Sequence, residues 1–305
     1  MRKSIHQHRV LFGLGVSAAA LFAANPAAAQ CVDEGAIWNC SGQNDAGQTV
    51  EQDGVEVRTQ PGFSVDTEDD SGLYLRGLGY QGYADQSSSS LTGKIDGLRV
   101  FGAGDRPIVD GGKGIIDIET NGMISGGSYG VHVLNDGSGG TRVKTTGDVS
   151  GREKAGIYVQ NISAASGDLT LDAGKVSGGE TGIEVRNTGV GKTKATATGD
   201  VVGGSGYGIY AENGSRAGDL EIIATNVRTD GLDAVSAENN GLGLTIIKIG
   251  GQVAGGTDGS GIDALNGDTA ANMSFEVGEV TGGQFGLYAR NEGRGRITIV
   301  AAGDV

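Results

Sequence analysis

Two glutamates are the residues best placed to do chemistry in this sequence. Glu184 lies in GIEVRN and Glu212 in GIYAEN, two copies of one repeated hexapeptide, and Arg186 lies close to both. Two carboxylates a few ångströms apart can act as acid and as base or nucleophile on a polysaccharide, as in a β-helical lyase or hydrolase. A catalytic cluster should interrupt a repeat, and this one does not. We therefore favour a solvated salt bridge and predict no catalytic residue.

Other reactive side chains are sparse. His132 is the only histidine after residue 29, and no G-x-S-x-G motif marks a serine partner for it. Residues 255–263, GGTDGSGID, resemble calcium-binding glycine-rich nonapeptides, but they lack the tandem nine-residue repetition that such sites need. We interpret this segment as a turn, and we predict neither a metal site nor a cofactor.

The first 29 residues have the features of a secretory signal peptide. A basic start is followed by an apolar run over residues 10–24 and by small residues up to Ala29. We expect cleavage after Ala29; the alternative, lipid attachment at Cys31, is disfavoured because Gln30 is larger than such sites accept. Export through the periplasm to the cell surface or medium is therefore predicted.

Charge and cysteine content fit an exported protein. Cleavage would remove three basic side chains and no acidic one, so the formal net charge would change from −14 to −17. Nucleic-acid binding is excluded, because it needs clusters of Lys and Arg. The only cysteines, Cys31 and Cys40, would enter an oxidising compartment, and we predict a disulfide between them. A metal-bound pair is disfavoured, because two sulfurs are too few ligands and no histidine is near.

Two columns of residues repeat at the same period of about 26. The hexapeptide, as in GIYVQN at 156–161, ends on an asparagine that recurs at Asn135, Asn161, Asn187, Asn213, Asn239, Asn266 and Asn291. A valine follows the same steps, at Val149, Val176, Val201, Val227, Val253, Val280 and Val305. Each repeat contains alternating segments that indicate short strands, and glycines separate them.

Stacking of such repeats predicts an all-β fold, a parallel β-helix of nine or ten coils with about 26 residues each. We assign residues 1–29 to the signal peptide, 30–66 to an N-terminal cap with a Cys31–Cys40 hairpin, and 67–305 to the coils. The asparagines fall on the inward side of a strand end. We expect a structural ladder in which their amides bond to one another and to turn backbone. The alternative is the preference of asparagine for turns.

The signal sequence, the early cysteine pair and the repeating GI-x-V-x-N and GDVSGG units resemble the passenger domains of bacterial autotransporters. This resemblance, over residues 30–305, implies a right-handed β-helix and display at the cell surface by an outer-membrane β-barrel translocator. No barrel strands are evident before Val305. We expect a truncated passenger, or one whose barrel is encoded separately.

The outward positions of the hexapeptide are the expected binding surface. We predict a structural or adhesin-like protein that binds a host-cell, matrix or glycan ligand through a repetitive rod surface. The candidate loops are an insertion at 103–114 and a protrusion at 85–90. The candidate side chains of the outward columns are Tyr158, Tyr210, Tyr288, Arg186 and Arg290.

Overall fold

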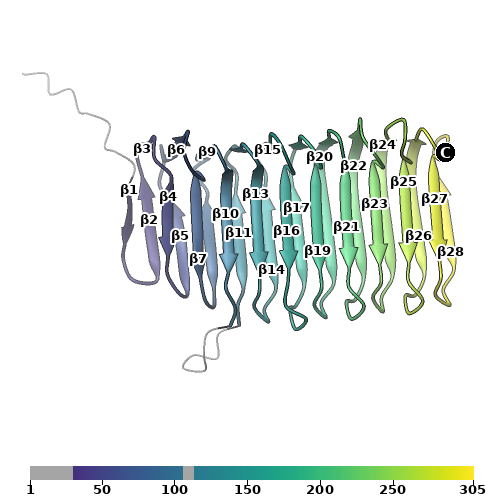
Figure 1. Cartoon of the computed structure of the whole chain (residues 1–305), viewed down its shortest axis with the longest axis horizontal. Helices are drawn as coiled ribbons and strands as arrows, with labels where there is room; N and C mark the ends of the chain where they lie inside the picture. Colours follow the sequence, from purple (N-terminus) through teal and green to yellow (C-terminus); the bar gives the residue numbers. More distant parts are fainter. Residues whose placement is uncertain (1–29, 106–112) are drawn as a thin grey trace, which may run out of the picture.

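The computed structural model describes residues 30–105 and 113–305, which form 28 β-strands and no helix. Successive coils stack into a rod, with β1 at one end and β27 and β28 at the other (Figure 1). The parallel β-helix predicted from the repeat is therefore confirmed. Within the described residues, no helix has the length and apolar character needed to cross a membrane. The predicted signal peptide lies outside the described residues.

One strand from each coil builds a ten-stranded parallel sheet. The register places the same position of successive hexapeptides side by side, so that Asn135 pairs with Asn161 and Asn161 with Asn187. The strands of this sheet are β4 (Gln48–Glu51), β7 (Leu73–Gly77), β10 (Asp96–Gly102), β13 (Tyr129–Asn135), β16 (Ile157–Asn161), β19 (Ile183–Asn187), β21 (Ile209–Asn213), β23 (Val235–Asn239), β25 (Ile262–Asn266) and β27 (Leu287–Asn291).

The remaining strands form an eighteen-stranded sheet. Its first row is β2 (Ile37–Ser41), β5 (Val55–Thr59), β8 (Gln81–Asp85), β11 (Ile116–Thr120), β14 (Thr141–Thr145), β17 (Leu169–Ala173), β20 (Thr193–Gly203), β22 (Leu220–Thr229), β24 (Thr245–Ala254), β26 (Met273–Thr281) and β28 (Ile297–Ala301). Its second row begins with β3 (Gln43–Asn44), β6 (Ser64–Thr67), β9 (Ser90–Gly93), β12 (Ile124–Gly126), β15 (Val149–Gly151) and β18 (Val176–Gly178). From β20 onward one strand serves both rows, and its register shifts between them.

Aliphatic columns fill the interior of the rod. Ile157 pairs with Ile183 and Val159 with Val185, and all four side chains are buried. Each such burial contributes about 1.5–3 kcal/mol to folding. The hexapeptide glycine has a steric reason here: a Cβ at Gly156 would lie 2.5 Å from Cγ1 of a valine of the second column. Close packing of valine against backbone, and not a positive φ, therefore explains why glycine recurs at this place.

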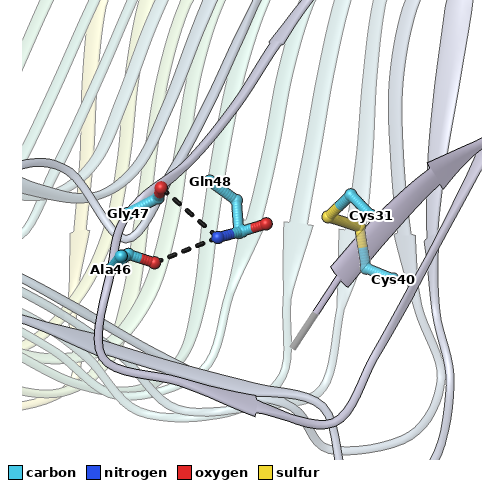
Figure 2. Close-up of a disulfide and its surroundings, with 5 residues drawn as sticks. All are labelled: Cys31, Cys40, Ala46, Gly47 and Gln48. Atoms are coloured by element: carbon cyan, nitrogen blue, oxygen red, sulfur yellow. Dashed lines mark hydrogen bonds between the residues drawn. A yellow bond between two sulfur atoms is a disulfide. The ribbon is translucent and has the colours of Figure 1, made fainter. Parts of the chain in front are cut away.

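A disulfide-closed hairpin covers the N-terminal end. β1 (Gln30–Asp33) pairs antiparallel with β2, and Cys31 and Cys40 are joined as predicted (Figure 2). Trp38 packs against the core and its Nε1–H donates to Gln52 at 2.7 Å. Because β2 pairs in parallel with β5, and β4 with β7, parallel stacking already begins within residues 30–66.

The two predicted loops differ in their outcome. The turn from Gly102 to Ile116 is eight residues longer than that between their partners Asn135 and Thr141, which confirms an insertion; its residues 106–112 lie outside the described part. The segment 85–90 is not a free protrusion, because Asp85 is buried and accepts hydrogen bonds from Thr59, Ser89 and Thr120. These hydrogen bonds outweigh desolvation and lower the pKa of Asp85.

The asparagine column is buried, as expected, but its hydrogen bonds differ from the prediction. The described amides do not bond to one another. Asn161 donates from Nδ2 to the Gly167 carbonyl at 3.1 Å and accepts from the Thr141 hydroxyl at 2.6 Å, and Thr141 in turn accepts from Asn135. Threonine thus bridges adjacent asparagines. The same bridge recurs every 52 residues, at Thr193 and Thr245, and makes two coils the structural unit.

Candidate functional site

The outward side chains of the ten-stranded sheet form one long surface, called here the outer face. Strand pairing aligns them in two columns, as the sequence predicted, and most are half-buried by their neighbours. One column is Thr49, Tyr74, Arg99, His132, Tyr158, Glu184, Tyr210, Ser236, Asp263 and Tyr288. The other is Glu51, Arg76, Phe101, Leu134, Gln160, Arg186, Glu212, Glu238, Leu265 and Arg290.

Aromatic side chains gather on this face. Six of the eight tyrosines lie on its strands or in the turns that lead into them: Tyr74, Tyr129, Tyr158, Tyr207, Tyr210 and Tyr288. Cations stack on several of the rings; the Arg99 guanidinium lies 5.1 Å from the Tyr74 ring centroid and that of Arg186 4.7 Å from Tyr210. The outward side of the eighteen-stranded sheet carries ion pairs such as Arg142–Asp117 and Lys194–Glu221. The two faces of the rod therefore differ in chemistry.

The carboxylates with catalytic potential are held by one arginine. Arg186 donates from Nε to Glu184 at 2.7 Å and from a terminal nitrogen to Glu212 at 2.9 Å. The Tyr210 hydroxyl also donates to Glu212, at 3.2 Å. An arginine bound to both carboxylates favours the ionised form of each, whereas a general acid must hold a proton. This geometry supports the salt-bridge interpretation of the three residues.

Two further acids were not singled out from the sequence. Glu238 stacks directly beyond Glu212 in the same column, and among the described residues it forms no salt bridge. Desolvation and the Glu212 charge raise the pKa of Glu238. Desolvation and the nearby Asp233 likewise raise the pKa of Asp263. The column order could have shown that one arginine is shared by a longer series of acids. The described residues contain no group of three or more His, Cys, Asp or Glu side chains able to hold a metal.

His132 belongs to an aromatic cluster. Its Nδ1 lies 3.1 Å from the carboxylate of the buried Asp96, so a His–Asp pair exists, but no serine among the described residues completes a triad. Instead the imidazole packs against Tyr129, at 4.5 Å between ring centroids, and against Tyr158, at 5.4 Å. Asp96 thus orients the ring within the outer face.

The five side chains proposed for binding lie on one surface. Tyr158, Arg186 and Tyr210 occupy neighbouring coils and are linked to other side chains of the face; the Tyr158 hydroxyl donates to Gln160 at 2.7 Å. Tyr288 is 42% exposed, and Arg290 forms an ion pair with Glu292. The first three residues are therefore held in place by their neighbours before any ligand arrives.

No protein-family model matches this sequence, and comparisons with curated proteins and with solved structures gave no match. The resemblance to autotransporter passenger domains thus stays a prediction from the repeat pattern. Any function assigned to the chain must be argued from the geometry of the outer face.

Proposed function

We propose that this chain is an exported, adhesin-like rod that binds a partner at the cell surface or in the medium through its outer face. The observation that carries the proposal is the segregation of aromatic rings, with arginines stacked on them, onto one side of a rigid solenoid. Tyrosine and arginine are the residues that dominate binding surfaces, because they bury large areas and lose little side-chain entropy.

Export is supported by two features. The sequence of residues 1–29 has the pattern of a secretory signal, and the Cys31–Cys40 disulfide suits an oxidising compartment. Surface display would need an outer-membrane β-barrel translocator as partner, as the resemblance implies. Expression of the whole chain with and without residues 1–29, followed by fractionation, tests export; retention of the whole chain in the cytoplasm contradicts it.

Binding is tested with purified residues 30–305 applied to cells, to extracellular matrix and to immobilised polysaccharide. A variant that combines Tyr158→Ala, Tyr210→Ala and Arg186→Ala should lose most of the signal, because it removes the centre of the outer face. The matched control combines Tyr80→Ala, Arg142→Ala and Lys194→Ala on the other sheet. Equal loss in the two variants would contradict the proposal.

The same preparation distinguishes binding from catalysis. We expect bound polysaccharide to be recovered intact. Turnover that is abolished by Glu184→Gln or by Glu212→Gln would replace the binding proposal with a polysaccharide lyase or hydrolase.

A further inference from the structure

We propose that the outer face binds a linear, neutral polysaccharide that lies along the rod and stacks its sugar rings on three equivalent aromatic pairs. This inference rests on the proposed function and names the ligand class of the same face. It is carried by a recurrence within the structure that the 26-residue period alone does not require.

The three pairs share one geometry. In each, an aromatic residue in the approach to a strand packs against a second ring three positions later, on the strand itself. Ring centroids are separated by 4.5, 5.3 and 5.6 Å and the rings are inclined by 36°, 41° and 36°. The pairs are Tyr129 with His132, Tyr207 with Tyr210, and Phe285 with Tyr288.

The pairs are evenly spaced along the rod. Each is separated from the next by 78 residues, which is three coils: β13 to β21, and β21 to β27. At about 4.8 Å per strand, neighbouring pairs lie roughly 14 Å apart on the same face. A regular row of platforms on a straight sheet matches a regular linear polymer better than a folded protein, whose surface does not repeat at one interval.

The chemistry beside each pair suits sugar hydroxyls. The C–H faces of a pyranose pack on aromatic rings, while its hydroxyls both donate and accept hydrogen bonds. The central pair has Arg186 as a donor and Glu212 as an acceptor, and the last pair has Arg290 and Glu292. Lys154 lies over the first pair, 5.4 Å from the Tyr129 ring centroid. Mixed donors and acceptors would thus surround each stacking surface.

Charge decides which polysaccharide fits. The chain carries a formal net charge of −14, and Glu238 and Asp263 lie on the outer face without a salt-bridge partner among the described residues. An anionic glycan would be repelled along this stretch. A neutral polymer meets no such penalty, which favours β-linked glucans, xylans, mannans or chitin as probes.

The spacing makes a sharp prediction about ligand length. An extended chain of pyranoses advances by a distance close to one strand spacing per sugar, so the fourth sugar would reach the next pair. Titration of residues 30–305 with neutral oligosaccharides, from disaccharide to octasaccharide, should show affinity rising in a step at the tetrasaccharide and again at the heptasaccharide. Each step should exceed about tenfold, because the second contact is intramolecular.

The variants are chosen to separate stacking from stability. Replacing the central pair by Tyr207→Ala with Tyr210→Ala should abolish the steps and weaken octasaccharide binding about tenfold or more. Tyr210→Phe should retain most of the affinity, and Tyr80→Ala on the other sheet is the matched control. Thermal unfolding of each variant verifies that the solenoid is intact.

Two results would overturn the inference. One is an affinity that does not step with length, or a central-pair variant that binds as well as the Tyr80 control. The other is absence of binding to every neutral oligosaccharide and polymer in the panel. If cells or matrix are still bound and that binding is lost in the outer-face variant, the polysaccharide claim fails while the proposed function stands.

Discussion

Truncation of one buried asparagine should destabilise the solenoid by an amount that its contacts specify. Asn161 is fully buried, and Asn161→Ala removes the bond from Thr141 and the bond to the Gly167 carbonyl. Each buried group left without a partner costs about 1–3 kcal/mol. The hydroxyl loses its acceptor, whereas the carbonyl keeps only a long contact from Asn187 at 3.5 Å. We therefore expect a loss of about 2–4 kcal/mol.

The assay is urea unfolding of residues 30–305 followed by circular dichroism. The matched control is Asn226→Ala, which removes an exposed amide that also makes two hydrogen bonds, to Asp200 and from Gln252. Water can replace those partners, so the control should cost less than about 1 kcal/mol. A double-mutant cycle with Thr141→Val should show coupling of about 1 kcal/mol. Similar losses for the buried and the exposed asparagine would refute the reasoning.

Three further predictions concern the core, the outer face and the cap. Ile183→Asp should cost at least about 3 kcal/mol in urea unfolding because it buries a charge, and Glu184→Ser less than about 1 kcal/mol; equal effects would mean that the faces are misassigned. Because the raised pKa of Glu238 makes its ionisation unfavourable in the folded state, stability is lost as pH rises through and above 4.5; Glu238→Gln should stabilise at neutral pH and not below 4.5, and a pH-independent effect would contradict this. Joint replacement of Cys31 and Cys40 by serine should cost about 2–4 kcal/mol, seen as faster hydrogen exchange in β1 and β2; unchanged exchange would remove the role of the cap.

Most of the architecture could be predicted because a solenoid turns sequence period into spatial register. The spacing of the asparagine and valine columns fixed which residues would stack, and the observed pairing of Val149 with Val176, or of Tyr158 with Glu184, follows it directly. The alternation of Ile157 and Val159 with polar residues set the inward side in the same way. The disulfide followed from there being only two cysteines.

The rest depended on contacts that the period does not encode. The threonine bridges between asparagines alternate over two coils, so a search at one coil does not find Thr141 and Thr193 as equivalent. Tyr129 and Tyr207 lie in turns of unequal length, and only the structure shows that each packs on the ring three residues later. Asp85 was assigned to a loop because its polar neighbours hid its place at an inward position.

The most direct test of the account is a hydroxyl-radical footprint of residues 30–305 with and without the ligand that binds them most tightly. If the outer face is the binding surface, Tyr158, Tyr210 and Tyr288 should be protected on binding, while Tyr80 on the other sheet keeps its reactivity. Protection of Tyr80 with no change at the three outer-face tyrosines would contradict the central claim.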